Sequence, residues 1–164
     1  MVTRTHVLIP IAAAAVIVGV FGMLTFPTDV KLESVEFPRG TIQLDDKILE
    51  VQIADNDALR ARGLMFQDQM PYDQGMLFVF DNPGLRPMWM LNMQFHLDII
   101  WFDENQNVIG IEKHVPPCMT TVEVVTCREN GVSRDNAKYV LELTSGFVDN
   151  FNITDKSKLE LISI

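Results

Sequence analysis

At 164 residues, of which 48% are hydrophobic, the chain has room for one globular domain and little else. Its 22 acidic residues outnumber its 13 basic residues, which gives a formal net charge of -9 at pH 7. An acidic surface repels nucleic acid and anionic lipid headgroups, so neither is an expected partner.

An apolar run without charged residues covers residues 7–26. As a helix it would span about 30 Å, which is the thickness of the hydrocarbon core of a bilayer. Pro10 falls in its first turn, where proline is tolerated. A cleaved signal peptide is the alternative, but its apolar core is usually roughly 7 to 15 residues long and is followed by a small-x-small pattern, which this sequence lacks. We therefore expect an uncleaved transmembrane helix.

The charges around this run predict its orientation. Arg4 and the amino terminus precede it, so the positive-inside rule keeps residues 1–6 in the cytoplasm. Residues 27–40, which include prolines and alternating charges, then form a linker, and residues 41–164 form an extracytoplasmic domain. The expected location is the cell membrane, with a single pass and the membrane itself as the partner of the N-terminal helix.

An extracytoplasmic location affects the chemistry that we expect of three further residues. Cys118 and Cys127 are the only cysteines, and in an oxidising compartment we expect them to form a disulfide. A two-cysteine metal site is the alternative, although no histidine or cysteine pair with zinc-like spacing lies nearby. Asn152 opens an Asn-Ile-Thr sequon and is a candidate glycosylation site.

The first part of the domain predicts a hairpin and a helix. In TIQLDDKILEVQI (residues 41–53), two apolar segments flank a turn at Asp45 and Asp46, which indicates strand, turn, strand. A short helix follows, with Asn56 as its N-cap and Gly63 in the left-handed conformation that closes it.

The remainder is dominated by short apolar segments with turn signals between them. DNPG at 81–84 is expected to end the first strand, and DENQN at 103–107 to form a hairpin turn. SGFVDNFNI at 145–153 predicts a helical turn. The expected strands are Gly75–Phe80, Met88–Met90, Leu97–Phe102, Val108–His114, Val122–Val125, Tyr139–Leu143 and Leu159–Ile162.

Six blocks occur in a characteristic order: ARGLM, GMLFVF, MWMLN, LDIIWFD, VPPC and YVLEL, the last followed by Gly146. Together they resemble the domain of unknown function 192 family over about residues 41–162. The resemblance implies a compact, β-rich fold with short helices and no established activity. Two positions depart from the family pattern, because Leu91 stands where a lysine is usual and His96 where a proline is usual.

The expected fold class is therefore mainly β (α+β). We expect a compact, barrel-like single domain with one or two short helices, preceded by the transmembrane helix.

The methionine-rich block suggests a metal site. In a strand, Met88 and Met90 would share one face, and His96 follows closely in sequence. Thioethers select Cu(I), so these three residues could form a copper site. The alternative is that the methionines only fill the core, and then no cofactor is expected.

Asp98 is a lone carboxylate in the apolar strand LDIIWF, so it needs a hydrogen-bonding partner, an ion pair or a wet concave site. Arg62 and Asn92 are its candidate partners. A structural pair and a ligand-binding site that also includes Trp89 both remain open.

These patterns favour a non-catalytic module that binds an unknown small molecule or an envelope protein through Arg62, Trp89, Asn92 and Asp98. The first alternative is a copper-binding protein. The second is a hydrolase acting on envelope polymers, for which paired carboxylates such as Asp98 and Asp103 are only a weak indication.

Overall fold

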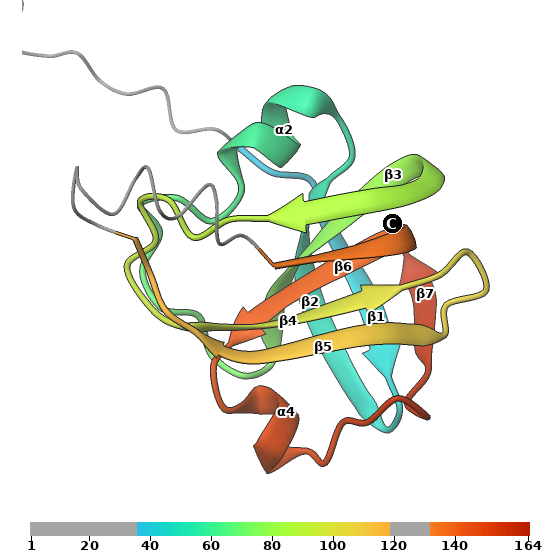
Figure 1. Ribbon diagram of the computed structural model, residues 1–164. Coiled ribbons are helices and arrows are strands. Elements are labelled where there is room, and N and C mark those ends of the chain that lie inside the picture. Colours follow the sequence, from blue (N-terminus) through green and yellow to red (C-terminus); the bar gives the residue numbers. More distant parts are fainter. Residues whose placement is uncertain (1–35, 119–131) are drawn as a thin grey trace, which may run out of the picture. The chain divides into compact units, whose positions relative to one another are not determined.

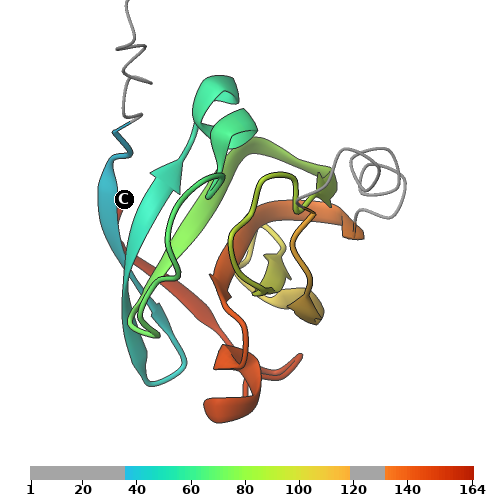
Figure 2. The ribbon, with the colours of Figure 1, turned by 90° about the vertical axis from the view of Figure 1, so that its left-hand side faces the viewer.

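The computed structural model describes residues 36–118 and 132–164. In this part of the chain, seven strands form one sheet in the order β5-β4-β6-β3-β2-β1-β7, which curls into a half-barrel (Figures 1 and 2). The strands are β1 (Arg39–Leu44), β2 (Lys47–Ala54), β3 (Gln74–Met88), β4 (Leu97–Phe102), β5 (Val108–Val115), β6 (Val132–Thr144) and β7 (Leu159–Ser163). The helices are α2 (Asp57–Arg62) and α4 (Phe147–Asn150). The prediction of a mainly β domain with one or two short helices is confirmed.

Two predicted segments lie outside the described residues: the transmembrane helix at 7–26 and the strand at 122–125. Within 36–118 and 132–164, neither helix has the length and apolar character needed to cross a membrane.

The predicted hairpin at 41–53 is confirmed as β1 and β2. The two strands pair antiparallel, with Leu44 opposite Lys47, and Asp45 takes a positive φ of 54° in the turn. β1 begins at Arg39, slightly before the expected domain boundary. β2 then pairs with β3 in parallel, which requires a crossover connection, and α2 lies in that connection.

The predicted N-cap of α2 is confirmed, and Gly63 is its C-cap as predicted, but with ψ -147° rather than in the left-handed helical conformation. The Asn56 side chain accepts a hydrogen bond from the Leu59 amide at 3.0 Å, and Gly63 ends the helix with φ 49°. Leu59 is the buried residue of this short helix. In Figures 1 and 2, α2 and α4 lie at opposite ends of the sheet.

Two predictions around β3 are wrong. DNPG does not end the strand, because β3 continues to Met88 and pairs with β6 beyond it, with register shifts on either side of Gly84. These shifts let the strand bend through residues that would otherwise favour a turn. The strand predicted at Met88–Met90 does not form either, since Met88 is the last residue of β3 and the chain leaves the sheet at Trp89.

The two faces of the sheet pack against different clusters of apolar residues. Alternate residues of a strand point to opposite faces, and along β6 Val140 belongs to one cluster and Leu141 to the other. We call the cluster that contains Val140 the first core cluster. It also includes Phe78, Met88, Met93 and Trp101, all buried. The second core cluster includes Leu44, Leu77, Phe102, Leu141 and Phe147, also buried.

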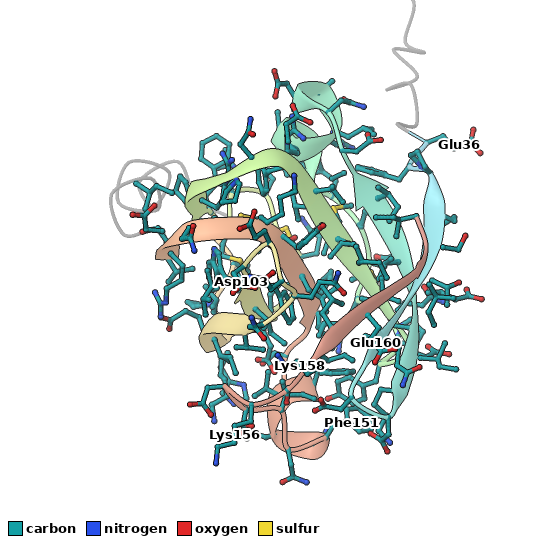
Figure 3. The ribbon with its side chains drawn as sticks, turned by 90° about the vertical axis from the view of Figure 1, so that its right-hand side faces the viewer. Glu36, Asp103, Phe151, Lys156, Lys158 and Glu160 are labelled. Atoms are coloured by element: carbon teal, nitrogen blue, oxygen red, sulfur yellow. The ribbon has the colours of Figure 1, made fainter. Side chains whose placement is uncertain are left out.

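The turn between β4 and β5 is held by Asp103, as its position in DENQN predicts. The Asp103 carboxylate accepts hydrogen bonds from the backbone amides of Asn105 at 2.8 Å and Asn107 at 2.9 Å. Partial burial acts to raise the pKa of this carboxyl group, but hydrogen bonds from Asn107 outweigh it and the pKa is lowered. Lys158 donates to the Asn107 side chain, and Figure 3 shows Lys158 close to Asp103. The role of Asp103 is therefore to stabilise the turn between β4 and β5.

Candidate functional site

A cavity of about 230 Å³ lies at the α2 end of the sheet. Its wall comes from α2 and the residues after it, from β3, from the segment after β3, and from a single residue of β6. The lining residues are Arg60, Ala61, Arg62, Gly63, Leu64, Met65, Phe78, Phe80, Pro87, Met88, Trp89, Leu91, Met93 and Glu142. Most of these are apolar, as is typical of small-molecule sites, whose volumes run from roughly 300 to 1,000 Å³.

Glu142 is the residue that β6 contributes to this cavity. It lies opposite Met76 of β3 and Ile99 of β4, on the face of the first core cluster, and only 3% of it is exposed. Burial raises the pKa of this carboxyl group to about 8, because removal from water disfavours the charged form. At neutral pH the group is therefore mostly protonated.

The Glu142 carboxyl group has no hydrogen-bonding or ionic partner among the described residues. No fully enclosed polar side-chain atom in this part of the chain lacks a partner, so the oxygens of Glu142 must open onto the cavity it lines. A buried polar group without a partner costs free energy. Such a group is expected where a ligand supplies the partner.

Sequence analysis missed Glu142, although the signal was present. YVLEL places one carboxylate among apolar residues of a strand, which is the same pattern that singled out Asp98 in LDIIWF. Both residues proved buried, Asp98 fully and Glu142 at 3% exposure. They differ in their partners, which the sequence pattern does not reveal.

Two arginines of α2 line the same cavity but differ in their contacts. Arg60 donates to the Asp57 carboxylate at 2.8 Å and to the Val79 carbonyl oxygen at 2.7 Å. Arg62 is half-buried, and its guanidinium carbon lies 5.1 Å from the centre of the Phe66 ring. No carboxylate of a described residue pairs with Arg62, so its donors are available to a ligand.

Of the four predicted ligand-binding residues, the structure brings two together at this cavity. Arg62 and Trp89 both line it. Asn92 and Asp98 do not: Asn92 has a positive φ of 55° and holds the loop through its backbone, donating to the Cys118 carbonyl oxygen at 3.0 Å. The cavity therefore brings Arg62 and Trp89 together with Glu142, whereas Asn92 and Asp98 lie elsewhere.

Neither candidate partner of Asp98, Arg62 or Asn92, forms a hydrogen bond or an ion pair with it in the structure. Asp98 is fully buried and accepts three backbone hydrogen bonds, from His114 at 2.9 Å, Gly146 at 3.0 Å and Val148 at 2.9 Å. It pairs with Leu143, so it faces the second core cluster, on the opposite side of the sheet from Glu142. The carboxylate is satisfied by amides and needs no arginine.

The predicted copper ligands do not share a cavity. Met88 and Met90 are buried at 7% and 4% exposure, within the first core cluster. Met88 lines the cavity of Glu142, whereas His96 is exposed and lines a separate shallow pocket with His114 and Ser145. Among the described residues there is also no group of three His, Cys, Asp or Glu side chains able to hold a metal ion. Copper binding stays a prediction without geometric support.

A serine, a histidine and an aspartate meet near the start of α4. His114 Nδ1 lies 2.6 Å from Ser145 Oγ, and His114 Nε2 lies 3.2 Å from Asp149 Oδ2. The side chains resemble a hydrolase triad, but the nearest amides are engaged: that of Ser145 donates to the His96 carbonyl oxygen, and that of Gly146 to Asp98. Neither is available to stabilise an oxyanion. The group ties α4 to β5 and gives no support to the hydrolase alternative.

Two further predictions concern covalent modification, namely a disulfide and a glycosylation site. Cys118 is half-buried against the first core cluster, but Cys127 lies outside the described residues, so their disulfide stays a prediction. Asn152 is exposed, with φ 53°, and its glycosylation is likewise untested.

The comparisons with known proteins assign the family. The model of the DUF192 family, described as Uncharacterized ACR, matches residues 40–161. The chain belongs to this family, as the six ordered blocks predicted. None of the functionally curated proteins matches it.

Two solved structures show the same fold. One is a proposed transcription regulator from Sinorhizobium meliloti 1021, with a TM-score of 0.68, 27% identity, and coverage of 78% of this chain and 97% of that one. The other is a protein of unknown function from Novosphingobium aromaticivorans DSM 12444, with a TM-score of 0.66, 21% identity, and coverage of 82% and 99%.

Proposed function

We propose that the domain is a non-catalytic module that binds a small amphipathic molecule in the cavity between α2, β3 and β6. The observation that carries this proposal is Glu142, a carboxyl group at 3% exposure that opens onto an apolar cavity and has no partner among the described residues. The half-buried Arg62 on the same wall adds a charged group without a carboxylate partner. At about 230 Å³ the cavity suits a ligand smaller than a typical drug molecule.

A regulatory role in DNA binding is not part of this proposal. The Sinorhizobium structure is named as a proposed regulator, but a net charge of -9 opposes contact with a phosphate backbone.

The proposal includes attachment to the membrane through residues 7–26, with the domain on the extracytoplasmic side. It rests on the uncharged apolar run and the position of Arg4. The full chain should remain in the membrane pellet after a carbonate wash. A soluble mature form beginning near Pro27 would show that the run is a cleaved signal peptide.

The binding proposal is tested by a fragment screen on the full chain in detergent. Small aromatic and aliphatic fragments of about the size of indole are scored by thermal shift, confirmed by titration calorimetry. A fragment at ten times its Kd should stabilise the fold by about 1.4 kcal/mol. Leu91→Trp should block binding, because the larger indole ring would extend from the wall into the cavity.

Leu85→Trp is the matched control, because Leu85 is 60% exposed and does not line the cavity. Fragments should bind this variant as they bind the unmodified chain. Fragments that bind Leu91→Trp equally well, or a screen in which nothing binds at millimolar concentration, would refute the cavity as a ligand site.

A further inference from the structure

The polar groups of the cavity are few and differ in kind, which restricts the ligand they can recognise. Arg62 comes from α2 and Glu142 from β6, and the wall shared with them is mostly apolar. A ligand must therefore satisfy one cationic group and one carboxyl group while burying an apolar body. The following argument rests on the proposed ligand-binding function and adds the class of ligand.

Arg62 is suited to a carboxylate. A guanidinium group presents five donors in a planar fork that matches a carboxylate in two parallel hydrogen bonds. Arg60 already uses its donors on Asp57 and two backbone carbonyl oxygens. Arg62 contacts only the face of Phe66, at 5.1 Å, among the interactions of the described residues. An acid group on the ligand would complete its hydrogen bonds.

Glu142 is suited to an uncharged polar group. Burial raises its pKa to about 8, so at neutral pH it is mostly a neutral acid with one donor and one free acceptor. A hydroxyl or carbonyl group on the ligand can bond to this acid without bringing a second charge into the buried site. A second carboxylate on the ligand would bring that charge and is disfavoured.

The wall shared with these two groups determines the body of the ligand. Phe78, Met88 and Met93 are 3%, 7% and 3% exposed and line the cavity together. Methionine side chains are flexible and pack well against aromatic rings. An aromatic or short aliphatic body therefore fits the apolar wall.

We infer that the cavity binds a small monocarboxylic acid with an apolar body and a second, uncharged hydrogen-bonding group. Its carboxylate meets Arg62, and its hydroxyl or carbonyl group meets Glu142. Because Arg60 uses its donors within the protein, Arg62 is the cation available on this wall among the described residues.

Three matched compounds test the ligand class by titration calorimetry on the full chain at pH 7. The parent is 3-(4-hydroxyphenyl)propanoate; 3-phenylpropanoate lacks the hydroxyl group, and 3-(4-hydroxyphenyl)propanamide lacks the carboxylate. With the unmodified chain, loss of the carboxylate should raise Kd about tenfold, because a bidentate charged hydrogen bond is lost. Loss of the hydroxyl group should raise Kd about fivefold, as expected for one neutral hydrogen bond.

Two variants assign these losses to residues. In Arg62→Gln, the parent and the amide should bind equally, and in Glu142→Leu, the parent and 3-phenylpropanoate should bind equally. Arg39→Gln is the control for removing a positive charge, because Arg39 is exposed on β1 and does not line the cavity. It should leave all three affinities unchanged.

The outcomes separate this inference from the proposed function. If the three compounds bind equally and neither variant alters their affinities, while Leu91→Trp still blocks them, the cavity binds ligands but the ligand class is wrong. If none of the three binds at millimolar concentration, the ligand class is also wrong, and the fragment screen alone decides whether the cavity binds ligands.

Discussion

Asp98 of β4 caps α4, the helix that begins at Phe147: its Oδ2 atom accepts hydrogen bonds from the Val148 amide at 2.9 Å and the Gly146 amide at 3.0 Å. Its Oδ1 atom accepts the His114 amide of β5 at 2.9 Å. One buried carboxylate thus joins β4, β5 and α4, and satisfies amides at the start of a helix that Gly146, which has no side chain, leaves uncapped. Its role is structural.

Asp98→Asn should destabilise the fold by about 2 to 4 kcal/mol. The amide side chain can accept at one oxygen, but its NH₂ group must face a backbone donor, which loses charge-assisted hydrogen bonds and leaves a buried amide unsatisfied. Urea unfolding of the variant and the unmodified chain measures the difference.

Arg62→Gln serves as the comparison in the same measurement, because Arg62 lies at the cavity on the opposite side of the sheet. It should change the free energy of unfolding by less than about 0.5 kcal/mol, and the double variant should be additive. A coupling energy above about 1 kcal/mol would mean that the two side chains interact after all.

Glu142 should make stability depend on pH. The folded state holds a proton on this carboxyl group between the ordinary pKa of 4.5 and the raised value of about 8, whereas the unfolded chain has lost it. The free energy of unfolding should therefore fall as pH rises through this window, by about 1.4 kcal/mol per pH unit from this group alone.

Glu142→Gln isolates this contribution, because glutamine has a similar shape and stays neutral at every pH. The variant should match the unmodified chain near pH 4 and exceed its stability increasingly from pH 5 to 8. Other titrating groups are common to both proteins and cancel in the difference. A difference that is constant with pH would show that the Glu142 pKa is not raised.

The disulfide between Cys118 and Cys127 remains to be tested. Alkylation of the denatured, unreduced protein should add no mass at either cysteine. Reduction should lower the free energy of unfolding by about 2 to 3 kcal/mol, since the bridge restricts the unfolded chain by closing a short loop. Two alkylated thiols before reduction would contradict the prediction and the oxidising compartment from which it follows.

The sequence predicted that Asp98 needs a partner, but neither of the candidates, Arg62 and Asn92, is that partner. Its amide donors lie at His114, Gly146 and Val148, far along the chain, and only the pairing of β4 with β5 and β6 brings them near. Local patterns show that a buried carboxylate must be satisfied, but they do not show by which backbone group. Glu142 illustrates the same limit, since its open side is created by the packing of α2 and the segment after β3.

Local signals predicted most elements correctly where they agreed with packing, as at the Asp45 turn and the Asn56 cap. They failed at DNPG, because pairing with β6 resumes beyond it and outweighs the turn preference of Pro83 and Gly84. The prediction of a strand at Met88–Met90 was wrong for a related reason. Burial of Met88, Met90 and Met93 satisfies the apolar pattern without a strand beyond Met88.

The close approach of β3 and β6 beside Glu142 leads to a last prediction. A Cβ atom added at Gly75 would lie 2.9 Å from the carbonyl oxygen of Glu142 and 2.9 Å from a methyl group of Leu143. The carbonyl oxygen is fixed in the sheet and has little freedom to move. Gly75→Ala should therefore destabilise the fold by about 1 to 3 kcal/mol, through overpacking.

Gly84→Ala is the matched control on the same strand. Its added Cβ atom would meet only the flexible Arg86 side chain, at 3.5 Å, so its free energy of unfolding should change by less than about 0.5 kcal/mol. Gly75 pairs with Leu143, so the added methyl group would point to the second core cluster, away from the cavity, and the effect of Gly75→Ala should be on stability. Equal stability of the two variants in urea unfolding would mean that β3 and β6 are less tightly packed beside Glu142 than the structure indicates.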